Sequence, residues 1–389
     1  MLKYTTASKS IYQTLLLTCL LLTFVCSCAV GGGEDKPQTN GESNFTLSAT
    51  TNEKGIAAVS FGMPSGVTKF SVTAKTQKST ASVRYTQIKN SNGDDYLFPG
   101  GSSLSLGDTY GVAVKAINIP SRSVDRGVSN DLTYNITLQV IDSSGDQLAG
   151  ETISVTVNGK NDPSLDSGSM TMNLFYVGDV GADPDTLTAV KTALNTTKAI
   201  FSGPGSISLR INEFSIEGPV VLPSPLNGSS IYQSASGMAP SPAVNIFIGG
   251  DIGGTGLGGG VLGFAADIPG PPFSSPRSVT AISIFENAGP DGIFSAQDAR
   301  LLGETIAHES GHFMGLFHPI DFSGSSVAFT DPLADTPSCS FITECLSNSV
   351  LSHNLMYPSP VADGSGGFVN QNELTSNQGS VMNRYLAVD

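Results

Sequence analysis

The sequence predicts a β-rich chain with more than one domain, an N-terminal all-β sandwich followed by an α+β domain. One reason is composition: among 389 residues, 44 are glycine, 22 are proline and only 13% are charged. Few charges and many turn-forming residues are typical of strand-rich proteins and unlike helix bundles. A second reason is a period-2 pattern from about residue 45 to 160. A third is the change to mixed helical and strand patterns after about residue 170.

Composition and charge also exclude some classes of protein and indicate where a site lies. Hydrophobic residues make up 39% of the chain, which is enough to form a core and excludes wholesale disorder. Acidic residues outnumber basic ones by 33 to 19, so the net charge is −14. Because nucleic-acid binding needs patches of Lys and Arg, we expect no nucleic-acid partner. All four histidines lie between His308 and His353, which makes this stretch the first candidate for a site.

Residues 1–28 have the pattern of an export signal. Two lysines precede an apolar run, residues 15–25, which is too short to span a bilayer. The end of this run resembles the lipobox of bacterial lipoproteins, which implies that Cys28 is lipidated and is the first mature residue. Cys26 is an alternative lipidation site, and an ordinary cleaved signal is a further alternative. We therefore expect a protein that is attached to the cell envelope or outer membrane through a lipid anchor, or one that is secreted.

Residues 29–44 are Gly-rich and polar, so they predict a flexible linker. Residues 45–160 then predict the sandwich, of immunoglobulin-like or jelly-roll type. The expected strands are 56–62, 69–76, 82–88, 110–117, 132–142 and 152–158. No cluster of residues here suggests chemistry, so a stalk or binding module is the favoured interpretation. A pro-domain that masks an active site is the alternative.

After a linker at 161–169, residues 170–389 predict the second domain. Its expected strands are 172–177, 206–212, 244–248, 261–266 and 278–285. One helix is expected over about 184–200. A second, over about 296–314, begins with a capping box formed by Ser295 and Asp298.

This second helix carries the pattern His308-Glu309-x-x-His312-x-x-Gly315-x-x-His318. His308 and His312 are one turn apart, so their imidazoles leave the same face and can hold one Zn²⁺. Gly315 can adopt the left-handed conformation that ends a helix, which lets His318 return as a third ligand. Three protein ligands leave a fourth position for water, and Glu309 can act as its general base. Three histidines merely hydrogen-bonded on a helix surface would not explain why histidine is nearly absent elsewhere.

With this motif, residues 170–389 resemble the metzincin zinc endopeptidases. Residues 353–358 (HNLMYP) are similar to the methionine turn of that family. The resemblance implies that Met356 lies beneath the metal as an apolar floor, the alternative being a core methionine after a loop. It also implies a catalytic domain with a mixed five-stranded sheet, an active-site helix and a Met-turn. Individual features resemble matrixins, serralysins and pappalysins in turn.

Residues 259–270 resemble the matrixin edge strand. The resemblance implies that a substrate peptide pairs with this edge and lies over the zinc. The edge residues concerned are Val261, Leu262, Gly263, Phe264 and Ala265. In matrixins, histidines of the Gly-rich loop before this strand hold a second, structural zinc. The similar loop here, 249–260, has no histidine, so the resemblance implies one catalytic Zn²⁺ and no second zinc. Its Asp251 and carbonyls could bind Ca²⁺, although glycine flexibility alone explains the loop.

Cys339 and Cys345 are the two cysteines outside the leader. In an exported protein a local disulfide between them is the default, and metal ligation is the less favoured alternative.

The sequence therefore predicts a secreted or lipid-anchored zinc metalloendopeptidase that acts on protein or peptide substrates. Hydrolysis would use a zinc-activated water, with Glu309 as general base. The alternative is a surface adhesin or binding lipoprotein in which the protease-like part is only a scaffold. The presence of Glu309 argues against this alternative, because a binding protein does not need the base.

Overall fold

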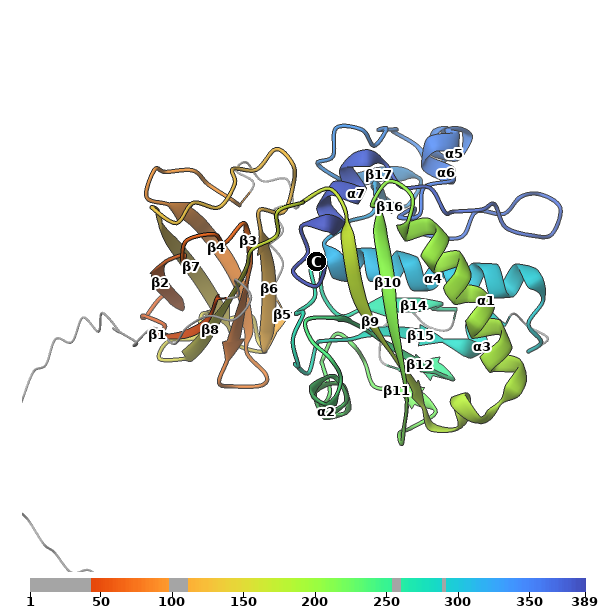
Figure 1. The fold of residues 1–389 in the computed structure, drawn as a ribbon, viewed down its shortest axis with the longest axis horizontal. Coiled ribbons are helices and arrows are strands. Elements are labelled where there is room, and N and C mark those ends of the chain that lie inside the picture. The colour runs from red at the N-terminus through yellow and green to blue at the C-terminus, as the bar shows by residue number, and fades with distance from the viewer. Residues whose placement is uncertain (1–42, 98–110, 254–259, 289–291) are drawn as a thin grey trace, which may run out of the picture. The chain divides into compact units, whose positions relative to one another are not determined.

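The computed structural model describes residues 43–97, 111–253, 260–288 and 292–389 (Figure 1). The predicted signal segment 1–28, with Cys26 and Cys28, lies outside these residues, as does all of the predicted linker except its last two positions. The described chain is β-rich and contains several sheets. None of its described helices is both long enough and apolar enough to cross a membrane.

The described residues between 43 and 160 form two four-stranded antiparallel sheets, in the orders β1-β8-β3-β6 and β2-β7-β4-β5. Their bounds are β1 (Ser43–Thr50), β2 (Ile56–Gly62), β3 (Lys69–Thr76), β4 (Ser82–Asn90), β5 (Gly111–Val112), β6 (Val114–Ile119), β7 (Thr133–Ile141) and β8 (Thr152–Lys160). Val72 and Val155 of the first sheet share one apolar cluster with Tyr85 and Ile136 of the second. The two sheets therefore form a sandwich around a common core.

The sandwich differs from the sequence prediction at two places. Strand β1 is not among the expected strands. The expected strand at 110–117 is divided into β5 and β6, because Ala113 between them has a positive φ of 60°. A non-glycine residue in that conformation interrupts the extended backbone of a strand.

The chain from Gly168 onward is organised by a five-stranded mixed sheet in the order β10-β9-β12-β15-β14. The bounds are β9 (Gly168–Val177), β10 (Ile207–Ile216), β12 (Val244–Gly249), β14 (Gly263–Ala265) and β15 (Thr280–Ser283). Strands β10, β9, β12 and β15 are parallel, and β14 is an antiparallel edge strand on β15. Two small ladders pair β11 (Val221–Leu222) with β13 (Asp251–Ile252), and β16 (Ile320–Ser323) with β17 (Ser326–Thr330).

Two of the predicted strands in this region are too long. Val261 and Leu262 precede β14 and are not part of it. The strand expected at 278–285 ends at Ser283, because the Ser283 side chain accepts the N–H of Glu286 and begins a short helix.

Helices α1 and α4 pack together on one face of the mixed sheet (Figure 1). The helices are η1 (Gly178–Ala182), α1 (Pro184–Phe201), α2 (Ser230–Met238), α3 (Ile284–Asn287), α4 (Ala296–Met314), α5 (Ile342–Ser347), α6 (Ser349–Ser352) and α7 (Ser376–Asn383). Helix α1 begins at Asp183, whose carboxylate accepts the backbone N–H of Thr186. Helix α4 begins at the predicted capping box of Ser295 and Asp298. Local capping therefore sets the start of both long helices.

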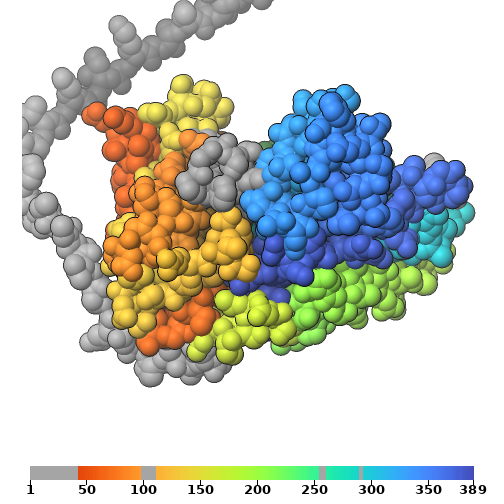
Figure 2. Space-filling view, turned by 90° about the horizontal axis from the view of Figure 1, so that it is seen from above, coloured from red at the N-terminus to blue at the C-terminus, as the bar shows by residue number. Residues whose placement is uncertain are grey.

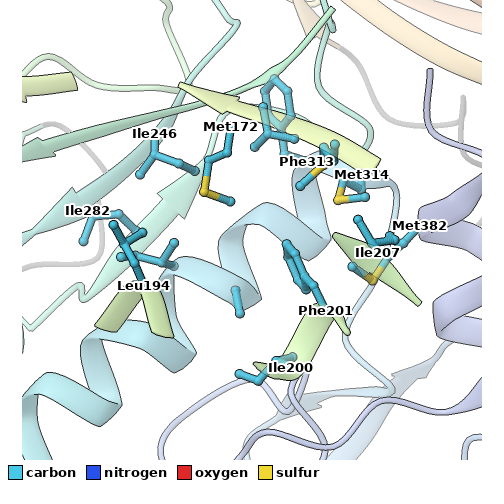
Figure 3. Packing of buried hydrophobic residues seen from close by; sticks show 14 of the residues in the cluster. Met172, Leu194, Ile200, Phe201, Ile207, Ile246, Ile282, Phe313, Met314 and Met382 are labelled. Atoms are coloured by element: carbon cyan, nitrogen blue, oxygen red, sulfur yellow. The ribbon is translucent and has the colours of Figure 1, made fainter. Parts of the chain in front are cut away.

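The core beneath α4 is apolar and continuous (Figure 3). Phe313 and Met314 of α4 pack with Met172 of β9, Ile246 of β12 and Phe201 of α1. Burial of each such side chain contributes roughly 1.5–3 kcal/mol, so these contacts hold α4 firmly against the sheet.

A second apolar cluster covers the other face of this sheet. Phe175 of β9 and Phe247 of β12 stack with their ring centroids 4.6 Å apart, and Tyr232 of α2 packs against Phe247. The sheet is thus buried on both faces, as expected where most of its strands are parallel.

The described residues after α4 form a region with little regular structure. On the face shown in Figure 2 they appear in blue as one continuous surface. Cys339 and Cys345 form a disulfide in this region, and Cys345 is buried beside Ile320 and Leu351.

Candidate metal centre

Helix α4 and the turn after it bring three of the four histidines together. Gly315 ends the helix with a φ of 113°, so the chain reverses and His318 returns beside His308 and His312. The Nε2 atom of His318 lies 3.0 Å from Nε2 of His312 and 3.3 Å from Nε2 of His308. Within the described ranges, this is the one group of three or more His, Cys, Asp or Glu residues whose ligand atoms converge.

The two histidines on α4 are oriented by backbone carbonyls. Nδ1 of His308 is 2.6 Å from the Leu355 oxygen, and Nδ1 of His312 is 2.7 Å from the Leu316 oxygen. A carbonyl only accepts hydrogen bonds, so Nδ1 is the protonated nitrogen of each ring. Burial lowers the pKa of His308 to about 3, and it lowers the pKa of His312 well below its ordinary value. Both rings are therefore neutral at pH 7 and present Nε2 lone pairs.

The third histidine is oriented by a carboxylate. Nδ1 of His318 lies 2.7 Å from Oδ1 of Asp321, which follows three residues later on β16. This contact places the His318 proton on Nδ1 as well. A carboxylate that accepts from a ligating imidazole fixes the ring and raises its basicity.

These residues fit a zinc ion. Two nitrogens bound at 2.0–2.1 Å and at the tetrahedral angle are about 3.3 Å apart, close to the 3.0 and 3.3 Å that separate Nε2 of His318 from the other two Nε2 atoms. Ring nitrogens that converge in this way repel one another unless a proton or a metal cation lies among them. Three protein ligands also leave a fourth position for water or substrate, as in catalytic zinc sites.

Glu309 is held beside this cluster by the edge strand. Its Oε2 atom accepts the backbone N–H of Ala265 at 2.8 Å. Gly263 lies so close that a Cβ there would be 2.6 Å from Cγ of Glu309. Burial raises the pKa of Glu309 to about 8, against the lowering effect of the Ala265 hydrogen bond. A carboxyl group with a pKa near ambient pH can both take up and return a proton.

Met356 lies beneath the helix and is fully buried. Its Sδ atom packs against Gly311, where an added Cβ would be only 2.7 Å away. The turn that carries Met356 is fixed by Asn354 and Gln378, whose amides exchange hydrogen bonds of 2.9 and 3.1 Å. The structure therefore places Met356 as an apolar support for α4 rather than among the converging nitrogens.

A cavity of about 600 Å³ opens over the three histidines and Glu309. Its walls include α4, the segment from Tyr357 to Pro360, and the edge residues Val261, Leu262, Gly263, Phe264 and Ala265. All five predicted edge residues thus face the site, although only the last three belong to β14. One side of β14 pairs with β15, which leaves its other side toward the cavity without a strand partner among the described strands.

The fourth histidine and the residue considered for Ca²⁺ lie outside this site. His353 ends α6, its Nδ1 is 2.8 Å from the Ser349 oxygen, and it does not line the cavity. Asp251 lies on β13, where Oδ1 accepts the N–H of Ile252. Residues 254–259 of the loop proposed for Ca²⁺ lie outside the described chain, so that expectation is untested.

Sequence reasoning missed several residues that shape the site. Gly311 and Asp321 are examples, together with the Asn354–Gln378 pair. Glu304 is another: it lines the cavity, is buried, and accepts two hydrogen bonds from Arg300 at 2.7 and 2.9 Å. A glycine in the middle of a helix was the one local signal available, because such a glycine commonly has a packing reason.

Comparisons with known proteins do not assign a family. No protein-family model and no curated protein matches this chain. Metalloproteinase-II from Bacteroides fragilis is a similar solved structure, with a TM-score of 0.30 and 12% identity over 62% of this chain and 63% of that one. The match therefore spans less than two thirds of that metalloproteinase.

Two further solved structures show lower TM-scores. The infectious bursal disease virus Gx strain has a TM-score of 0.19 and 10% identity over 32% of this chain and 33% of that one. A family two carbohydrate esterase from Cellvibrio japonicus has a TM-score of 0.14 and 10% identity, over 55% and 68% of the two chains. At these values, functional conclusions must come from the site itself.

Proposed function

We propose that the chain is a zinc-dependent endopeptidase whose α+β region is a metzincin-type catalytic domain. The observation that carries this proposal is the convergence of three Nε2 lone pairs, from His308, His312 and His318, beside the buried carboxyl group of Glu309. A bound metal cation accounts for the first feature, and proton transfer next to that cation accounts for the second.

When bound, Zn²⁺ would supply a Lewis acid that polarises a substrate carbonyl and lowers the pKa of a water molecule. The residues of the chain perform the remaining tasks. The carboxylate of Glu309 takes the proton of the attacking water and later returns it to the nitrogen of the leaving amine. The Ala265 N–H holds Oε2 of Glu309 at 2.8 Å and so fixes the orientation of the carboxylate for both transfers.

The edge strand favours a peptide as substrate. An extended peptide can add to the outer side of β14, because β15 does not use the backbone groups on that side, of which the Ala265 N–H is the one that donates to Glu309. The bond to be cleaved would then lie next to Glu309, which contacts both Gly263 and Ala265. A small ester would make no use of such a strand.

We also propose that the protein is exported and anchored through a lipid on Cys28, or secreted. The leader pattern described above supports this proposal. Mass spectrometry of the mature N-terminus after expression in a bacterium tests it, since an acylated cysteine at position 28 would be identified directly. An unprocessed Met1 would contradict it.

The central experiment compares the full chain with its Glu309→Gln variant. We expect both to hold about one zinc ion per chain by elemental analysis, because the three histidines are unchanged. Cleavage of a peptide library should fall by about 10³-fold in the variant, the scale expected for loss of a general base. Glu217→Gln, at an exposed glutamate that does not line the cavity, is the matched control and should retain full activity.

Two results would contradict the proposal. Undiminished cleavage by Glu309→Gln would exclude Glu309 as the base. Zinc bound by the unaltered chain without cleavage of any peptide would instead favour a binding lipoprotein with a protease-like scaffold.

A further inference from the structure

The outer face of one sandwich sheet is buried. Ser71 of β3 lies opposite Asn118 of β6 and Asn158 of β8, so these three side chains share one face. Their neighbours Phe70 and Val72 point to the opposite face, into the sandwich core. Outward polar residues of a free-standing sandwich are exposed to water, yet all three are buried here. Another part of the described chain therefore covers this face.

The C-terminal residues contribute one part of the cover. Lys69 of β3 is buried, pairs with Asp162 at 2.6 Å, and donates to the Val388 carbonyl at 2.7 Å. Lys160 at the end of β8 donates to the carbonyls of Leu386 and Val388. A charged amine without solvent needs such partners, so these contacts specify one position for the chain end.

A second buried ion pair joins the sandwich to the segment that follows the edge strand. Lys115 of β6 is fully buried, and its Nζ atom lies 2.6 Å from Oδ1 of Asp267 and 3.4 Å from the Ile268 carbonyl. Asp267 is also buried. The guanidinium of Arg277, which belongs to the α+β region as Asp267 does, is 3.9 Å from Oδ2 of Asp267. Asp267 lies only two residues beyond Ala265, the last residue of β14.

Strand β14 forms three residue pairs with β15, and after it the N–H of Ala266 donates to the Val279 carbonyl at 3.1 Å. Before it, the Leu262 carbonyl accepts from the Ser283 N–H and from Nδ2 of Asn287, and after it the Ala266 carbonyl accepts from Arg277. All of these partners belong to the α+β region. A strand this short cannot be held rigidly by its ladder alone. The attachment that comes from the sandwich is the Lys115–Asp267 pair, and the strand that it adjoins holds Glu309 through Ala265.

We propose that Lys115 is a positioning residue through which the N-terminal sandwich holds the edge strand in register for peptide binding. The inference rests on the proposed endopeptidase function. It gives the sandwich a role other than stalk or removable pro-domain: the sandwich supports the substrate-binding edge. Lys115 acts through Asp267 and β14 and touches neither the substrate nor the three histidines.

The test uses the double variant Lys115→Met/Asp267→Asn in the full chain. Both members of the pair are neutralised together, and the buried Arg277 keeps its hydrogen bonds to the Leu226 and Ala266 carbonyls. The matched control is Lys69→Met/Asp162→Asn, which removes a buried pair of the same 2.6 Å separation from the same sheet. Where the double variant does not fold, Lys115→Met alone takes its place, because Asp267 then still has the guanidinium of Arg277 3.9 Å away.

Hydrogen exchange of residues 263–266 is the first measurement, because it needs no enzyme activity. We expect protection of these amides to fall by about 10-fold or more in the Lys115/Asp267 variant and to remain unchanged in the control. Zinc affinity should be equal in both. Equal protection in the two variants, whether retained or lost, would overturn the proposal.

Peptide kinetics are the second measurement. The Lys115/Asp267 variant should raise KM for an eight-residue peptide by about 10-fold or more, with a much smaller change for a dipeptide that cannot pair with the strand. Equal changes for both substrates would indicate a general loss of structure and would contradict the proposal. If the unaltered chain cleaves no peptide, the proposed function fails while hydrogen exchange still decides the role of Lys115.

Discussion

Strand β7 of the sandwich and helix α4 of the α+β region bury their residues in different ways. Along β7 burial alternates, so Ile136 and Leu138 are fully buried while the residues between them are more exposed. Nearly all of α4 is buried from Leu301 onward, and the buried residues include Glu309 and His312. The strand buries apolar groups, which stabilises the fold. The helix also buries ionisable groups, which costs stability and is retained where those groups face a cavity.

This contrast predicts that mutations in the two regions will separate stability from chemistry. The largest effect on stability is expected for Ile136→Ala in the sandwich core. Removal of these buried atoms should lower the free energy of unfolding by about 3 kcal/mol, with zinc affinity unchanged. Urea unfolding and zinc titration measure the two quantities. Thr133→Ala, at an exposed position on the same strand, should change neither. A loss of zinc affinity in Ile136→Ala would break the separation.

A loss of activity without loss of the metal is expected for Gly263→Ala. The added Cβ would lie 2.6 Å from Cγ of Glu309, so the carboxylate must shift. We expect kcat/KM for peptide hydrolysis to fall about 100-fold, because small displacements of a catalytic group are costly, while zinc content is retained. Gly127→Ala is the control, since a Cβ at that position meets nothing within 4 Å. Unchanged kinetics would show that Glu309 does not need its present position.

A smaller effect is expected at the carboxylate that orients the third histidine. Asp321→Ala removes the acceptor 2.7 Å from Nδ1 of His318. Zinc affinity, measured by competition with a chelator, should fall about 10-fold, which is the lower end for such supporting residues. Asp146→Ala, in an exposed sandwich turn, should leave the affinity as it was. An unchanged affinity in Asp321→Ala would mean that His318 is oriented by its backbone alone.

The smallest effect concerns pH and the metal-free protein. Burial raises the pKa of Glu309 to about 8, so the folded chain keeps a proton that the unfolded chain releases. Stability must therefore fall as pH rises toward 8. The lowered pKa of His308 makes stability rise with pH, but only below about pH 6.5. The raised pKa of Asp331, about 7, makes stability fall with pH as Glu309 does, mainly below pH 7.

From pH 7 to 8 Glu309 therefore contributes most of the change, and the difference between the unaltered chain and Glu309→Gln isolates its part. We expect the free energy of unfolding to fall by about 1 kcal/mol across this interval, as linkage requires for a pKa of this size. Urea unfolding of the metal-free chain at the two pH values measures the change, and Glu309→Gln should lack it. Equal pH dependence in both proteins would contradict the raised pKa.

The sequence alone determined the features that depend on neighbouring residues. The start of α4 follows from Ser295 and Asp298 three residues apart, its end from Gly315, and the shared face of His308 and His312 from one helical turn. Most of the sandwich strands could likewise be predicted from alternation, because a strand side chain's direction depends only on its position in the strand.

Only the tertiary structure decided how these elements meet. The contact of Glu309 with Ala265 joins residues 44 apart, that of His308 with Leu355 joins residues 47 apart, and Lys115 and Asp267 are 152 apart. No local propensity encodes such pairs, because they depend on the packing of whole elements. The sequence thus determined which residues can hold a metal and transfer a proton. The fold determined the shape of the cavity over them and the supports that hold them in place.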